Sequence, residues 1–245
     1  MANWSDPRTT ATSFGGAAAG VREGVVDAGL RSYMLSVYNY MASGVLLTGI
    51  VAMLFARSGL ASQILAGPGI LKYVVMFAPL IFVMVLSFGI NRLSTTAAQG
   101  LFWAYAAVMG LSMSSIFLVY SGTSIAQTFF ATAAAFAGLS LFGYTTKKDL
   151  SGFGTFLIMG VVGLIVASLI NMFLHSSVLN LAISAIGVLI FAGLTAYDTQ
   201  KIKSMYAYVA GTDMVGKTVV MSALTLYLDF VNMFMFLLRF MGSRD

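Results

Sequence analysis

The sequence predicts an all-α membrane protein, a seven-transmembrane-helix bundle, from its composition and from the length of its apolar stretches. Of the 245 residues, 59% are hydrophobic and only 9% are charged, and the mean hydropathy is +0.92. A soluble domain carries about 25% charged residues, so the 13 basic and 8 acidic side chains cannot cover a water-exposed surface of this size. The absence of cysteine excludes a disulfide scaffold.

Seven apolar stretches are long enough to cross about 30 Å of hydrocarbon. They are too long for lipid-facing strands, which take about 10 residues each. We place them roughly at 32–56, 72–91, 98–119, 124–144, 152–174, 179–200 and 217–239. The links between them are short, apart from residues 201–216, so residues 31–242 are expected to form a single transmembrane domain.

Residues 1–30 differ in composition from the rest of the chain. They are rich in Ser, Thr, Ala and Gly, and no apolar core follows a basic start. A cleavable signal peptide is therefore not expected. We expect this stretch to be a flexible polar tail or an interfacial segment.

The basic residues predict how the chain is oriented in the membrane. With seven spans, nine of them fall on one side: Arg8, Arg22, Arg31, Arg92, Lys147, Lys148, Lys201, Lys203 and Lys217. Four fall on the other side: Arg57, Lys72, Arg239 and Arg244. Cytoplasmic loops carry the excess of Lys and Arg, so the N-terminus is expected in the cytoplasm and the C-terminus outside. The charges are spread thinly between apolar runs, so the expected partner is the lipid bilayer and not a nucleic acid.

Two ionisable residues fall clearly within the apolar stretches. Asp229 lies about a dozen residues into the seventh stretch, and Asp198 lies near the cytoplasmic end of the sixth. Asp198 reaches the level of Asp229 if the sixth helix continues past residue 200 toward Lys203. Thr195 shares a helix face with Asp198. A polar stripe at helical spacing accompanies Asp229, and its members are Ser222, Thr225 and Asn232.

The two polar faces should meet, because a carboxylate that faces lipid costs ~3 kcal/mol. Asp198 and Asp229 are therefore expected to pair and, since adjacent carboxylates cannot both ionise cheaply, to share a proton and respond to pH. The alternatives are that Asp198 is interfacial and pairs with Lys201 or Lys203, and that Asp229 makes a structural hydrogen bond. Arg92, which ends the second span, either snorkels to the interface or forms a charge-assisted pair with Asp198.

The segments around both aspartates resemble a family signature. They are Ala196–Ile202 (AYDTQKI) and Ala223–Phe234 (ALTLYLDFVNMF), and they are similar to those of the Bax inhibitor/lifeguard (transmembrane Bax-inhibitor-motif) family. The likeness covers about 31–242 and is to bacterial members. It implies a seven-helix bundle of the bacterial inner membrane with a pH-sensitive calcium leak. In this family an aspartate pair, matched by Asp198 and Asp229, senses protons. A latching arginine on the second helix is matched by the position of Arg92.

The expected function is thus a pH-sensitive, calcium-permeable leak with no resident cofactor. Calcium takes six to eight oxygen ligands. Asp198 and Asp229, with Ser222, Thr225, Asn232 and backbone carbonyls, give it a sparse and weak site. A weak site suits conduction, because an ion that is held tightly does not leave. The sequence contains no P-loop, no HExxH, no Ser–His–Asp arrangement and no Cys or His cluster, so we do not expect an enzyme.

Two other functions stay open at the level of the sequence. An intramembrane aspartyl protease also uses paired aspartates, on Tyr-Asp and Gly-x-Gly-Asp motifs. Asp198 follows Tyr197, but Asp229 follows Leu226-Tyr-Leu without the glycines. A membrane protein that regulates other membrane proteins would need no ion path of its own.

Overall fold

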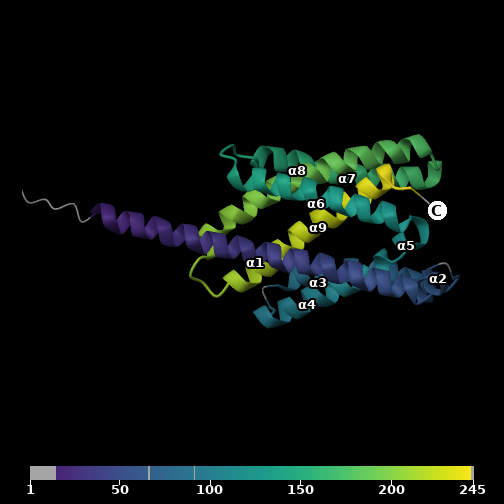
Figure 1. Cartoon of the computed structure of the whole chain (residues 1–245), viewed down its shortest axis with the longest axis horizontal. Helices are drawn as coiled ribbons and strands as arrows, with labels where there is room; N and C mark the ends of the chain where they lie inside the picture. The colour runs from purple at the N-terminus through teal and green to yellow at the C-terminus, as the bar shows by residue number, and fades with distance from the viewer. Residues whose placement is uncertain (1–14, 66, 91, 244–245) are drawn as a thin grey trace, which may run out of the picture.

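The computed structural model describes residues 15–65, 67–90 and 92–243 (Figure 1). This part of the chain forms nine helices: α1 (Gly15–Arg57), α2 (Leu60–Leu65), α3 (Leu71–Gly89), α4 (Thr95–Met113), α5 (Ile116–Val119), α6 (Gly122–Thr145), α7 (Ser151–Leu174), α8 (Ser177–Val209) and α9 (Val215–Met241). Seven spans are long and apolar enough to cross a membrane when α4 and α5 are counted as one. The predicted fold class is confirmed.

Serine residues set the first turn of three spans. The hydroxyl oxygens of Ser94, Ser121 and Ser176 each accept a hydrogen bond from the backbone N–H three residues later. Such a cap satisfies one of the orphan donors at the start of a helix. The caps explain why α4, α6 and α8 begin two or three residues before the apolar stretches that predicted them.

The prediction of a long link over residues 201–216 is wrong. Helix α8 continues to Val209 and α9 begins at Val215, so the link is five residues long. The polar residues that suggested a loop lie on a helix that extends beyond the apolar span, where water can solvate them. The Nζ of Lys203 donates to the carbonyl oxygen of Tyr144 at 2.8 Å, which holds this extension on the end of α6. The turn that follows contains Gly211, whose φ of +76° suits glycine.

The boundary expected at residue 31 is not a break in the structure. Helix α1 begins at Gly15 and runs through that position without interruption, while residues 1–14 lie outside the described part. The beginning of α1 extends past the bundle, near the turn between α8 and α9 (Figure 1). The rings of Tyr33 and Tyr206, with centroids 5.3 Å apart, pack α1 against the α8 extension.

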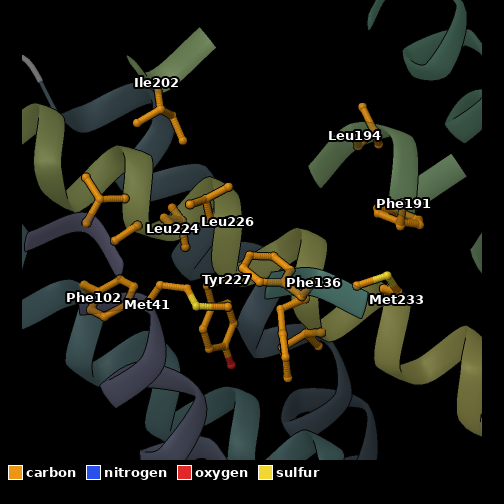
Figure 2. Close-up of a cluster of buried hydrophobic side chains, with 14 of the residues drawn as sticks. Met41, Phe102, Phe136, Phe191, Leu194, Ile202, Leu224, Leu226, Tyr227 and Met233 are labelled. Carbon is orange, nitrogen blue, oxygen red and sulfur yellow. The ribbon is translucent and has the colours of Figure 1, made fainter. Parts of the chain in front are cut away.

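Helix α9 is the central element of the bundle. It packs against α1, α4, α6 and α8, and 67% of its span is buried, compared with 11% for α3 and for α7. Figure 2 shows Leu224, Leu226 and Tyr227 of α9 among core side chains from α1, α4 and α6. A polar residue on the buried face of α9 is therefore removed from lipid and water alike.

Candidate functional site

The candidate site is the aspartate pair at the interface of α8 and α9. Asp229, in the middle of α9, is 4% exposed, and Asp198 on α8 is half-buried. The two side chains lie within hydrogen-bonding reach of each other. Two carboxyl groups can form a hydrogen bond only when one of them carries a proton. The geometry therefore brings together the two residues that the sequence singled out.

The length of α8 and the close approach of α6 bring Asp198 to this interface. Because α8 continues through Lys201 and Lys203, Asp198 lies inside the helix and not at its end. On the other side of α8, Gly143 of α6 sits directly against the carbonyl group of Ala196, where a Cβ atom would clash with backbone. Only a residue without a side chain allows two helices to approach so closely.

The surroundings of Asp229 leave its charge uncompensated. Its Oδ2 atom is buried and receives no hydrogen bond from any described residue, and the charged group that acts on it is Asp198. Asp198 also feels the charge of Lys201, one turn further along α8. A buried carboxylate without a cation or a donor is costly. A proton shared by the pair removes one of the two negative charges.

The polar residues that share a face with Asp229 make their hydrogen bonds elsewhere. Thr225 Oγ1 donates to the carbonyl oxygen of Met221 at 3.1 Å, and Asn232 Nδ2 donates to that of Leu228 at 2.8 Å, both within α9. The Ser222 hydroxyl lies 3.1 Å from the hydroxyl of Tyr33 on α1.

The polar residue predicted on α8 behaves in the same way. Thr195 is fully buried, and its Oγ1 donates to the Phe191 carbonyl oxygen at 2.8 Å. None of these hydrogen bonds reaches an aspartate, so a role of Thr195, Ser222, Thr225 and Asn232 along an ion path stays a prediction.

Arg92 forms no ion pair or hydrogen bond with Asp198 or Asp229 in this structure. It is exposed just beyond the end of α3, and α3 packs against α4 and α2. The charged groups that act on Asp198 in the described part of the chain are Lys201 and Asp229. The neighbouring cation is thus the lysine named in the alternative interpretation, and the latching role of Arg92 stays a prediction.

The acidic residues do not form a tight cation site. In the described part of the chain, no three His, Cys, Asp or Glu side chains gather into a group that could hold a metal ion. Two carboxylates fall well short of the six to eight oxygens that calcium takes. Any calcium at Asp198 and Asp229 would depend on water and backbone oxygens for most of its ligands.

Two hydroxyl pairs that tie α1 to α9 were not predicted from the sequence. One joins Tyr33 to Ser222 and the other joins Thr48 to Tyr227. A tyrosine within an apolar span signals that its hydroxyl needs a partner. The partner itself, 189 or 179 residues away, is visible only in the folded chain.

Comparisons with known proteins agree with the family resemblance found in the sequence. The family described as inhibitor of apoptosis-promoting Bax1 matches residues 30–245. A Rickettsia prowazekii protein is 50% identical over 219 residues, which cover 89% of this chain and 92% of the relative. The inner membrane protein YbhL of Escherichia coli is 47% identical over 219 residues, covering 89% and 94%. A membrane protein of Streptococcus pyogenes is 40% identical over 222 residues, covering 89% and 96%.

Proposed function

This chain belongs to the Bax1-inhibitor family of membrane proteins, and we propose that it is a pH-sensitive, calcium-permeable leak channel gated by Asp198 and Asp229. The observation that carries the proposal is the position of the pair. A buried carboxyl group on the central helix lies within hydrogen-bonding reach of a second one on the neighbouring helix. Ionisable groups at such places in membrane proteins are costly and serve function more often than stability.

The proposed gate works through the proton that the two carboxyl groups share. When the pair gains or loses that proton, the hydrogen bond between α8 and α9 changes and so does the charge between them. Two packed helices respond to such a change by shifting between discrete arrangements. Calcium would pass the pair without being held, because two carboxylates bind it weakly.

The proposal does not include catalysis. Around Asp229 the helix is continuous, and the preceding residues Leu226, Tyr227 and Leu228 belong to it. Closely packed side chains surround this turn of α9, and no glycine opens it to a substrate backbone.

We place the protein in the bacterial inner membrane, with its N-terminus in the cytoplasm and its C-terminus outside. The name of the Escherichia coli relative supports the location. The orientation is supported by the distribution of basic residues between the two ends of the bundle. The end with more of them carries the turn between α8 and α9. The described basic residues at this end are Arg31, Arg92, Lys147, Lys148, Lys201, Lys203 and Lys217, and they outnumber those at the opposite end.

Calcium flux into liposomes that contain only this protein tests the function. Wild type, Asp198→Asn, Asp229→Asn and the double variant are measured between about pH 5 and pH 8, the range in which paired carboxyl groups can exchange a proton. Wild-type flux should change with pH, and each single variant should lose that change because asparagine does not titrate. The double variant should be no worse than either single one if the two residues act as a unit.

Two control variants remove ionisable side chains that lie outside the pair. His175→Gln removes the single histidine, the residue type that most often changes charge in this range. Asp149→Asn removes an exposed carboxylate whose pKa is held below its usual value by hydrogen bonds from the side chain and backbone of Ser151. Both controls should keep the wild-type profile. If both single aspartate variants keep it as well, the pair is structural and the gate proposed here is wrong.

A further inference from the structure

A long apolar groove runs between α1 and α6 on the outside of the bundle. Both helices pack against α9, and they barely touch each other; in Figure 1, α9 passes between them. The groove has a volume of about 680 Å³. Its walls are residues of α1 and α6, and Phe230 of α9 forms its floor.

The groove has one polar end and one apolar end. Arg31 and Tyr144 line the end near the turn between α8 and α9, while Val45, Phe129 and Phe230 line the other end. Along α1, the 14 residues from Arg31 to Val45 rise about 21 Å. This length exceeds half of the roughly 30 Å of bilayer hydrocarbon, so the groove reaches across one leaflet.

The polar end of the groove carries a positively charged side chain. Arg31 is exposed, makes no ion pair or hydrogen bond with any described residue, and is the one charged side chain among the described residues that line the groove. A second cation, Lys203, lies beside Tyr144. The Nζ of Lys203 sits 4.8 Å from the ring centroid of Tyr144 and donates to the Tyr144 carbonyl oxygen.

We propose that this groove binds an anionic phospholipid from the leaflet at the Arg31 end. The lipid phosphate would contact Arg31, whose planar guanidinium suits phosphate oxygens, and one acyl chain would lie along the apolar floor. The polar end of the groove complements the headgroup of such a lipid, and the apolar remainder complements an acyl chain.

The proposed site does not depend on the channel function. It is made of residues of α1, α6 and α9, and neither Asp198 nor Asp229 lines it. Lipid binding can also be measured without any ion flux. The failure of one proposal therefore leaves the other standing.

Native mass spectrometry of the purified chain, titrated with phosphatidylglycerol or phosphatidylcholine, tests the site. Wild type should bind phosphatidylglycerol more tightly. Arg31→Gln should weaken phosphatidylglycerol binding about fivefold and affect phosphatidylcholine little, since one cation near a membrane surface contributes on that order. Ala137→Phe, which fills the groove from α6, should weaken the binding of both lipids; Ala42→Phe does the same from α1.

Two control variants match these changes outside the groove. Lys147→Gln removes an exposed positive charge at the same end of the bundle, and Ala134→Phe adds a ring to an exposed position of α6 that does not line the groove. Both should bind lipid as wild type does. The proposal is overturned if wild type binds the two lipids with equal affinity. It is also overturned if Arg31→Gln and the groove-filling variants all bind lipid as wild type does, or if two copies of the chain cross-link through α1 and α6.

Discussion

The hydroxyl groups of Thr48 on α1 and Tyr227 on α9 lie 2.7 Å apart in the apolar core. The Thr48 hydroxyl also donates to the carbonyl oxygen of Ala106 on α4 at 2.8 Å. Because this bond uses the single hydroxyl hydrogen of Thr48, the Tyr227 hydroxyl must be the donor toward Thr48. One polar contact therefore joins three helices, two residues before Asp229 on α9.

The two members of this contact should differ in their effect on stability. Tyr227→Phe removes one donor and leaves Thr48 bonded to Ala106, so it should lower the free energy of unfolding by about 1 kcal/mol. Thr48→Val removes both bonds and leaves the Tyr227 hydroxyl buried without a partner, which should cost about 1–3 kcal/mol. Denaturation in mild detergent measures both, and a larger loss for Tyr227→Phe would contradict the donor assignment.

A third tyrosine provides the control for this pair. The Tyr105 hydroxyl is buried and has no hydrogen-bond partner among the described residues, and its ring lies 5.4 Å from that of Tyr227. Removing an unpaired buried hydroxyl relieves a desolvation cost. Tyr105→Phe should therefore keep or raise the stability in the same assay. A loss as large as that of Thr48→Val would show that this hydroxyl has a partner.

Two glycines of α6 should respond in opposite ways to the same substitution. Gly143→Ala places a methyl group against the Ala196 carbonyl and must push α8 away, so it should destabilise the protein by more than 1 kcal/mol, on the order of an overpacked core. Gly138→Ala meets nothing within 4 Å and should be neutral or stabilising by up to about 1 kcal/mol, because alanine favours helix. Unfolding curves of both variants measure these changes in stability. Equal changes for the two variants would argue against the close α6–α8 contact.

The seven spans and the aspartate pair were accessible from the sequence for simple physical reasons. Hydrocarbon thickness fixes the length of an apolar helix, and the cost of charge in lipid directs Asp198 and Asp229 inward. The true length of α8 was not accessible in this way. Lys201 and Lys203 resemble loop residues by polarity, but a helix that leaves the membrane can carry polar residues on every exposed face.

The partners of individual small and polar residues required the fold. Thr225 and Asn232 share a face with Asp229 in the sequence, yet both donate to carbonyl oxygens of their own helix. Gly138 and Gly143 look alike in the sequence, and only the second meets a neighbouring backbone. Helical periodicity gives the direction of a side chain around its own axis, and the neighbour in that direction depends on tertiary packing.

Fusions to the C-terminus test the proposed orientation. Helix α9 begins near Lys217, at the end of the bundle where the described basic residues are more numerous, and it ends near Arg239 at the opposite end. A C-terminal alkaline phosphatase, which is active only outside the cytoplasm, should be active. A C-terminal green fluorescent protein exported by the same route should be dark. Bright fluorescence with inactive phosphatase would place the C-terminus in the cytoplasm and reverse the topology.

The two cations assigned to Asp198 can be separated by their effect on the resting leak. If Arg92 latches Asp198 in a closed state, Arg92→Ala removes a charge-assisted bond of about 1.5–3 kcal/mol and should raise calcium flux at resting pH. Lys201→Gln removes the cation that lies near Asp198 in the present structure. It should change the pH at which flux responds, because that charge acts directly on the pair. If Arg92→Ala folds normally and leaks as wild type does, Arg92 is an interfacial residue, and Lys201 is the cation that matters to the gate.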